Sequence, residues 1–241
     1  MHILALDTSD ARGSVALLSN DQVVQLERHD TDEEYSSWLL PAVGRALEAE
    51  SLTHKNLAGY AVAVGPGSFT GLRIGLTTVK AWSELFGTKI ATVSRLEALA
   101  SLVPEGGQPF VAAFLDAHRG QIFGALYRRS DDGLARIEEE MVISPERFLN
   151  FVAERVGGAP TSWVSPDGGV LEGLASWQDR ERSEDILTAV PAVFAPAVGK
   201  IGHREILAGR TVDALQLDAN YVRRSDAEIF WKTPRTAANR K

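Results

Sequence analysis

Hydrophobic and polar positions along the first hundred residues predict strands and helices in a regular order. Short apolar runs at 3–6, 14–18 and 22–28, separated by polar turns, predict three strands. The apolar positions of residues 32–50 recur at helical spacing on more than one stripe, which predicts a helix that buries two faces. Pro41 falls inside this helix and is expected to bend it or to mark an early turn.

The next segment adds two further strands and two further helices. Residues 59–64 form an apolar run typical of a buried strand, and a glycine-rich turn then leads into a helix that ends near residue 86. A strand over 89–93 and a short helix over 94–102 follow. The proline- and glycine-rich stretch 104–109 is typical of a link between two halves of a chain.

Beyond this link the order of elements repeats, with predicted strands at 110–115, 121–127 and 137–143, a helix over 145–156, a looser continuation and a helix at 195–207. Both halves contain an apolar strand, an aspartate, a short turn, Arg-Gly and a second apolar strand. The match predicts a duplicated α/β unit of order βββαβα. The predicted division is therefore one lobe at 1–105, a second at 106–212 and an extended basic tail at 213–241.

Composition and charge narrow the function classes. The chain has 241 residues, a net charge of −7 and no cysteine, which excludes disulfides, thiolate metal sites and a cysteine nucleophile. We therefore expect a cytoplasmic protein, with no membrane span because Gly65-Pro66-Gly67 breaks the uncharged stretch 57–72. Residues 221–241 carry six basic and two acidic side chains, so this tail is either a solvated terminus or an arm that contacts RNA or an acidic partner.

Two strand-end aspartates and the glycine-rich turn are the candidates for binding chemistry. The two-lobed arrangement resembles the actin-like ATPase and sugar-kinase superfamily, whose hairpins face the phosphates and metal of a nucleotide. In an active member Asp7 and Asp116 would bind metal-bound water or act as a base, whereas the simpler interpretation is that each closes a turn. The turn into the helix exposes N–H groups for an anion, although it lacks the ending of a P-loop. The residues predicted for a nucleotide or anion site are Asp7, Thr8, Ser9, Gly67, Ser68, Thr70, Arg73, Asp116 and Arg119.

The helix after the glycine-rich turn also allows a packing interpretation. Gly71 and Gly75 lie one turn apart, with Thr78 about one turn further on, so one face of the helix is almost bare and another helix could approach closely. The five histidines show no metal-ligand spacing, and the chain has no nucleophile motif of a serine hydrolase. We therefore expect no metal site and no catalytic residue.

Four segments together resemble the bacterial TsaB (YeaZ) family: the Ile3-Leu4-Ala5-Leu6-Asp7-Thr8-Ser9 start, Leu39-Leu40-Pro41, Gly65-Pro66-Gly67-Ser68-Phe69-Thr70-Gly71-Leu72-Arg73-Ile74-Gly75, and Asp116-Ala117-His118-Arg119-Gly120. The glycine-rich segment is highly specific to that family, and the resemblance extends to about Glu228. One departure is Tyr35, where many relatives have histidine.

The resemblance implies a non-catalytic scaffold that activates a catalytic paralogue, TsaD, together with a small ATPase, TsaE, in the threonylcarbamoylation of the adenosine beside the anticodon of tRNA. It also implies that the first two helices bind the partner, that the same surface can form a homodimer, and that tRNA is contacted through the complex. No cofactor is expected to be held tightly by this chain, although ATP or ADP could bind at the interface of the complex. The residues expected at the partner interface are Tyr35, Trp38, Leu39, Gly71, Leu72, Ile74, Gly75 and Thr78.

Two other functions compete with the scaffold. The first is an independent nucleotide-dependent phosphotransferase that uses Asp7 and Asp116. It is disfavoured because Asp7-Thr8-Ser9 lacks the glycine expected beside a phosphate-gripping aspartate. The second is a peptidase that acts on the paralogue, for which the sequence offers no pair of nucleophile and base.

Overall fold

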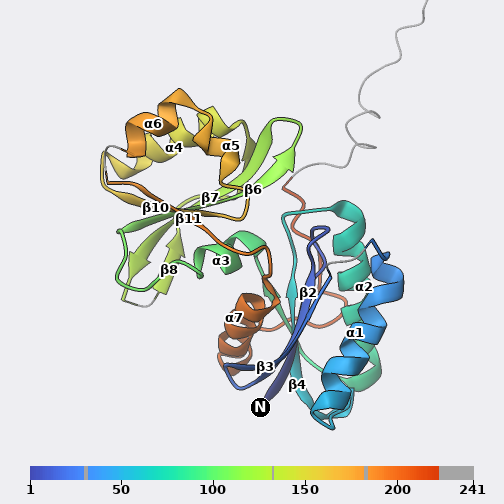
Figure 1. Cartoon of the computed structure of the whole chain (residues 1–241). Helices are drawn as coiled ribbons and strands as arrows, with labels where there is room; N and C mark the ends of the chain where they lie inside the picture. Colours follow the sequence, from blue (N-terminus) through green and yellow to red (C-terminus); the bar gives the residue numbers. More distant parts are fainter. Residues whose placement is uncertain (30–31, 132, 182–183, 223–241) are drawn as a thin grey trace, which may run out of the picture.

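The computed structural model describes residues 1–29, 32–131, 133–181 and 184–222, and these residues form two lobes, each built on a mixed β-sheet (Figure 1). The first sheet has the order β3-β2-β1-β4-β5 and consists of β1 (His2–Asp7), β2 (Ser14–Ser19), β3 (Gln22–Arg28), β4 (Leu57–Ala63) and β5 (Ile90–Val93). The second has the order β11-β10-β6-β7-β8 and consists of β6 (Phe110–His118), β7 (Gln121–Ser130), β8 (Gly133–Arg136), β10 (Thr161–Ser165) and β11 (Ile186–Ala189). A further strand, β9 (Met141–Ile143), pairs with β7.

The two sheets repeat one topology. In each, an antiparallel hairpin is followed by a third strand at the hairpin edge, and two later strands pair in parallel on the other side. When β6 is matched with β1 and β10 with β4, the strand orders coincide. The predicted duplicated α/β unit, and with it the two-lobed actin-like fold, is therefore confirmed.

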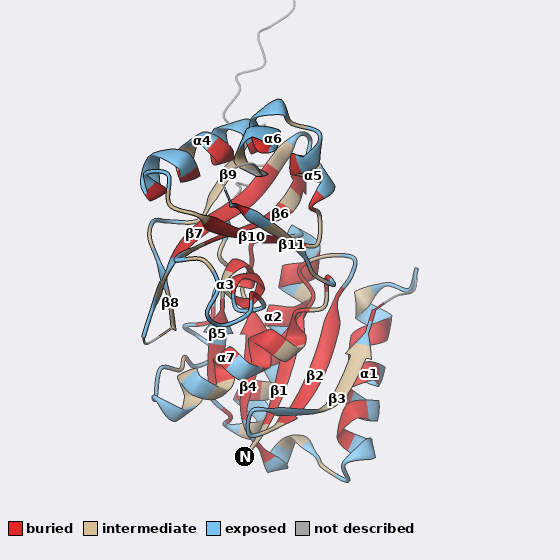
Figure 2. Ribbon diagram, turned by 60° about the vertical axis from the view of Figure 1, so that its left-hand side comes forward, coloured by how far each residue is buried: buried red, intermediate tan, exposed pale blue. Residues whose placement is uncertain are grey.

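Helices cover both outer faces and fill the space between the sheets (Figures 1 and 2). On the outer face of the first sheet lie α1 (Tyr35–Ala49) and α2 (Phe69–Phe86), with the short 3-10 helix η1 (His54–Asn56) at their end. On the outer face of the second lie α4 (Pro145–Val156), α5 (Gly169–Glu172) and α6 (Ala175–Glu181). Between the sheets lie α3 (Arg95–Ala100) and α7 (Ala195–Leu207), and one hydrophobic core joins both sheets through them.

Helix α7 packs on the first sheet, although the predicted second lobe at 106–212 includes it. Two glycines allow the close approach: a Cβ at Gly199 would lie 2.3 Å from a methyl of Leu18, and one at Gly202 would lie 2.3 Å from the Cβ of Ala61. After the second lobe the chain therefore returns to the first lobe, where α7 packs against strands from the first hundred residues. The predicted boundary at residues 105 and 106 stays a prediction.

Of the strand predicted over 137–143, only Met141–Ile143 forms a strand, as β9, and residues 137–140 lie in none. Within this stretch Glu140 turns its side chain inward. Its carboxylate is 2% exposed and accepts hydrogen bonds from the hydroxyl of Ser94 and, at 2.7 Å, from the side-chain amide of Asn220. Burial raises the pKa of Glu140 above its ordinary value. This one side chain ties the second lobe to the start of α3 and to the C-terminal segment.

The start of the predicted tail is packed rather than extended. Val212, just before the predicted tail, pairs with Ile90 at the edge of the first sheet. Within the tail, Leu217 is buried and the Asn220 N–H donates to Val64 O at 2.7 Å. The basic positions from residue 223 onward lie outside the described residues. Within the described part of the chain, no helix is both long and apolar enough to span a membrane.

Candidate functional site

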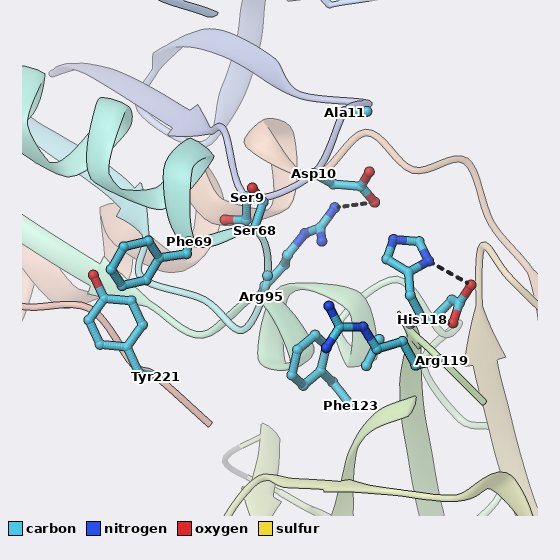
Figure 3. A pocket seen from close by; sticks show the side chains of 13 residues that line it. Ser9, Asp10, Ala11, Ser68, Phe69, Arg95, His118, Arg119, Phe123 and Tyr221 are labelled. Atoms are coloured by element: carbon cyan, nitrogen blue, oxygen red, sulfur yellow. Dashed lines mark hydrogen bonds and ion pairs between the residues drawn. The ribbon is translucent and has the colours of Figure 1, made fainter. Parts of the chain in front are cut away.

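A cavity of about 490 Å³ lies where the two hairpins face each other, beside the start of α2 (Figure 3). Both lobes contribute to it, since the β1–β2 turn forms one wall and the β6–β7 turn forms the opposite wall. The residues that line it are Ser9, Asp10, Ala11, Gly67, Ser68, Phe69, Arg95, Asp116, Ala117, His118, Arg119, Phe123 and Tyr221.

Asp7 ends β1 behind this cavity, and both of its carboxylate oxygens are already engaged. One oxygen accepts the Ser9 N–H at 2.9 Å, and the other lies 3.1 Å from Nε of Arg95. The Asp7 side chain is fully buried and that of Arg95 is 3% exposed. Ser94 caps α3 through hydrogen bonds from two backbone N–H groups, which places Arg95 in the first turn of that helix, beside Asp7. A buried ion pair of this kind holds the carboxylate as a structural group.

These contacts do not fit a divalent cation at Asp7. A cation bound to this carboxylate would lie close to the guanidinium of Arg95, which carries the same sign of charge. No group of three or more histidine, aspartate or glutamate side chains that could hold a metal occurs among the described residues. The sequence interpretation of Asp7 as a ligand of metal-bound water therefore lacks support in this geometry.

A chain of ion pairs continues from Arg95 across the cleft. Arg95 also lies 3.1 Å from Asp10, which lies 2.8 Å from Arg12 in the same turn. Arg12 then reaches the second lobe, where its second terminal nitrogen lies 3.0 Å from Asp167. The other oxygen of Asp167 accepts the N–H of Asp116 at 3.0 Å. Ion pairs and one hydrogen bond to the Asp116 backbone thus connect the two hairpins. The superfamily resemblance predicts a nucleotide and its metal at this position.

The ion pairs make stability depend on pH through Asp10. Burial alone would raise the pKa of Asp10, but Arg95 and Arg12 outweigh it and lower the pKa from its ordinary 3.8 to about 2. The ion pairs of Asp10 therefore stabilise the folded state fully above pH ~4, and this stabilisation is lost as the pH falls from ~4 toward ~2. We expect the difference in unfolding free energy between wild type and Asp10→Asn, measured by urea denaturation, to shrink over that range. Asp21→Asn in the exposed β2–β3 turn is the control, and a wild-type advantage that is constant down to pH ~2 would contradict the assignment.

The start of α2 is seated directly on the β1–β2 turn. The hydroxyl of Thr8 donates to Gly71 O at 2.7 Å, and Ser9 O accepts the Ser68 N–H at 2.7 Å. A Cβ at Gly67 would lie 2.2 Å from Ser9 O, so glycine is needed there for the close approach. Ser68 caps the helix by accepting the Gly71 N–H.

The same seating corrects the prediction for Gly71 and Gly75. Both are buried, and a Cβ would lie 2.0 Å from Thr8 O at Gly71 and 2.4 Å from Thr8 Oγ1 at Gly75. The bare face of α2 therefore meets the turn of its own chain and not a second helix. Trp38 and Leu72 are likewise buried in the chain, so neither offers a surface to a partner.

The surface that α1 and α2 do present is a pair of grooves on either side of Leu40. One groove, of about 400 Å³, is lined by Tyr35, Ser36, Leu39, Leu40, Arg73, Ile74, Thr77 and Thr78. The other, of about 560 Å³, continues from Leu40 toward η1 and Trp82. Of the predicted interface residues, Tyr35, Ile74 and Thr78 line this surface; Leu39 also lines it but is only 1% exposed. Leu40, which is 57% exposed, is not among the predicted residues. The hydroxyl of Tyr35 also donates to Asp10 O, which links the start of α1 to the cleft turn.

The predicted anion-site residues are only partly brought together. Those that line the cavity are Ser9, Gly67, Ser68, Asp116 and Arg119. Asp7 and Thr8 are buried behind it, Thr70 is exposed, and Arg73 lies over the Phe69 ring at 3.8 Å and lines the α1–α2 groove. The sequence interpretation missed the cavity residues Asp10, Ala11, Arg95, Phe69, Ala117, His118, Phe123 and Tyr221.

Comparisons with known proteins find a TsaD family model and TsaB relatives. The family model of TsaD, tRNA N6-adenosine threonylcarbamoyltransferase, matches residues 29–176. The tRNA threonylcarbamoyladenosine biosynthesis protein TsaB of Escherichia coli (strain K12) is 30% identical over 96% of this chain and 97% of its own length. The chain belongs to the TsaB family. The TsaB of Bacillus subtilis (strain 168) is 32% identical over 64% of this chain and 67% of its own length.

Solved structures agree with the TsaB family. YeaZ from Pseudomonas aeruginosa matches with a TM-score of 0.73 and 25% identity over 91% of this chain and 99% of that one. An uncharacterized protein with similarity to peptidase YeaZ, from the same organism, matches with a TM-score of 0.74 and 26% identity over 92% and 99%. Both lobes of this TsaB-family chain therefore have counterparts in solved relatives.

Proposed function

We propose that this chain is the non-catalytic scaffold of a tRNA threonylcarbamoyladenosine synthesis complex, and that it binds and activates a TsaD-like catalytic paralogue. Membership of the TsaB family supports the role in this biosynthesis. The Asp7–Arg95 ion pair is the main support for a chain without catalytic activity of its own, because it occupies the carboxylate that an actin-like phosphotransferase would need. The same observation disfavours the competing phosphotransferase.

The partner docks on the α1–α2 surface. Leu40 stands between two grooves there and is 57% exposed, so a partner that covers it would bury apolar surface. The outer face of the second sheet is covered by α4, α5 and α6, which bury Phe148, Leu171 and Trp177 in their own core. A TsaE-like ATPase joins the pair, ATP or ADP binds at the interface of the complex, and tRNA is contacted through the assembled complex.

Leu40→Glu is the variant that tests docking. Loss of a buried leucine together with an unpaired charge in an apolar interface costs about 3 kcal/mol or more, so the Kd for the TsaD-like paralogue is expected to rise at least about a hundredfold. Titration calorimetry with the purified paralogue measures this value, and the rate of threonylcarbamoylation by the mixture should fall in parallel at subsaturating concentrations. The fold should be unaffected because Leu40 is exposed.

Leu207→Glu is the matched control, because Leu207 is 68% exposed at the end of α7, on the opposite face of the first sheet. It should bind the paralogue as wild type does. Equal affinity of Leu40→Glu and wild type would refute the docking surface. Light scattering of the isolated chain tests the homodimer on the same surface, where Leu40→Glu should shift any dimer to monomer and Leu207→Glu should not.

A further inference from the structure

His29 follows β3 and is buried at the point where three parts of the first lobe meet. Its backbone N–H donates to Gly13 O at 2.9 Å, just before β2. Its ring lies between the β1–β2 turn and the segment that enters α1, since Nδ1 lies 2.8 Å from Ala11 O and Nε2 lies 2.6 Å from Glu33 O. Ala11 also lines the cleft cavity, so this side chain connects a wall of the cleft to the start of α1.

Both ring nitrogens of His29 face carbonyl oxygens, and this decides how many protons the ring carries. A backbone carbonyl can only accept a hydrogen bond. A neutral imidazole has one N–H and one lone pair, so it would satisfy one carbonyl and direct its lone pair at the oxygen of the other. Only the imidazolium, with an N–H on each nitrogen, donates to Ala11 O and Glu33 O together. The hydrogen-bond geometry therefore requires a positively charged ring.

Aromatic side chains of α1 surround this ring and suit a cation. The Tyr35 ring stacks on it with centroids 4.3 Å apart, and the Trp38 ring lies 5.0 Å away at 74°. The face of an aromatic ring attracts a positive charge. Burial raises the pKa of Tyr35, so its hydroxyl stays protonated and donates to Asp10 O. Tyr35 therefore holds the start of α1 on the same turn that His29 contacts.

The charged groups around His29 are consistent with a positive ring. Those on the elements that pack against it are Asp7, Asp10 and Arg12 in and before the β1–β2 turn, Asp32, Glu33, Glu34 and Tyr35 at the start of α1, and Glu27 and Arg28 in β3. Asp7 and Asp10 both pair with Arg95, and Glu27 pairs with Arg45. The three exposed acidic residues that precede α1 add negative charge near the ring, which favours the protonated imidazole.

We propose that His29 is a buried imidazolium that positions the start of α1 on the β1–β2 turn, and with it the α1–α2 docking surface. The effect on docking rests on the proposed scaffold function, because Tyr35 lines the groove beside Leu40. Loss of one ring proton would leave a lone pair facing a carbonyl oxygen, so one of the two ring hydrogen bonds would be lost. Docking of the TsaD-like paralogue therefore depends on this proton and weakens as the pH rises.

Nitrogen-15 NMR of the histidine rings in the full chain reads this protonation directly. At pH ~7.5 we expect both nitrogens of His29 to carry a proton. His54 is the internal control, because burial lowers its pKa and its Nδ1 lies 2.9 Å from the Tyr60 hydroxyl, which can donate to a lone pair. His54 should therefore be neutral in the same spectrum. An unprotonated ring nitrogen on His29 at this pH would overturn the proposal.

The signals of His29 are those that His29→Gln removes. If this variant does not fold, single substitutions of the other four histidines assign the signals by elimination. The spectroscopic result on wild type is thus obtained whether or not the variant folds.

Titration calorimetry with the purified TsaD-like paralogue tests the positioning role. Glutamine is neutral at every pH, so at pH ~7 His29→Gln should bind at least about fivefold more weakly than wild type. This difference should narrow over the pH range in which the spectra show that the wild-type ring loses its proton. His203→Gln in α7 is the matched control and should bind as wild type does throughout.

Two results of the calorimetry would overturn the positioning role: equal affinity of His29→Gln and wild type at pH ~7, or a difference that stays constant while the ring loses its proton. A failure of the scaffold function gives a different pattern. His29 would then carry both protons in the spectra, whereas Leu40→Glu would bind the paralogue as wild type does.

Discussion

Replacing Arg95 with methionine is expected to lower the free energy of unfolding at pH 7 by about 3–5 kcal/mol, because the fully buried carboxylate of Asp7 would lose its charged partner. Asp10 would lose one of its two arginines but keep Arg12, so most of the cost falls on Asp7. Methionine keeps much of the volume of the side chain and can still pack on Phe194, which Arg95 contacts at 5.0 Å from the ring centroid. Chemical denaturation measures the loss.

The double variant Asp7→Asn with Arg95→Met is the control for this mechanism. It removes both charges, so most of the lost stability should return, whereas a defect in packing alone would persist. A single variant as stable as wild type at pH 7, or a double variant no better than the single, would show that the pair does not hold the β1–β2 turn.

Arg95 also shows why the site could be predicted only in part. Residues 94–102 predict a short capped helix, which the structure confirms as α3, but nothing in that pattern says that its first side chain lies against a strand end 88 positions earlier. From the sequence alone, a charged residue at the start of an apolar helix is expected to be exposed to solvent. Phe69, Phe123 and Tyr221 reach the cavity for the same reason, as each packs against residues distant in the sequence.

The fold itself was predictable because it is duplicated. The β1–β2 and β6–β7 hairpins have the same order of apolar run, aspartate, Arg-Gly and apolar run, and matching strand orders follow from it. The less regular parts of the second lobe were not predictable. Of the strand predicted over 137–143 only Met141–Ile143 forms, and the carboxylate of Glu140 just before it is buried. Helix α6 and strand β11 belong to a stretch with no clear period. Helix α1 starts at Tyr35 rather than 32, and Pro41 is accommodated within it.

Substitutions at the glycines of α2 test whether they serve the fold or a partner interface. Gly71→Ala is expected to destabilise the fold by about 3 kcal/mol or more, because the new methyl group would lie 2.0 Å from the backbone oxygen of Thr8. Relief would require movement of the whole β1–β2 turn away from α2. Gly75→Ala should cost less, since the atom it meets at 2.4 Å is the Thr8 hydroxyl, although that hydroxyl must then release Gly71 O.

Gly44→Ala in α1 is the matched control, since a Cβ there would meet nothing within 4 Å. Alanine in a helix interior favours folding over glycine by about 1 kcal/mol, so this variant should be more stable than wild type. Opposite signs for two Gly→Ala changes on neighbouring helices, measured by chemical denaturation, would isolate the steric contribution of Thr8. A Gly71→Ala protein as stable as wild type would mean that the turn is not seated on α2. Because Gly75 faces Thr8, a bulky substitution such as Gly75→Trp would displace the β1–β2 turn before it met any partner, so surface positions such as Leu40 are the ones that report on docking.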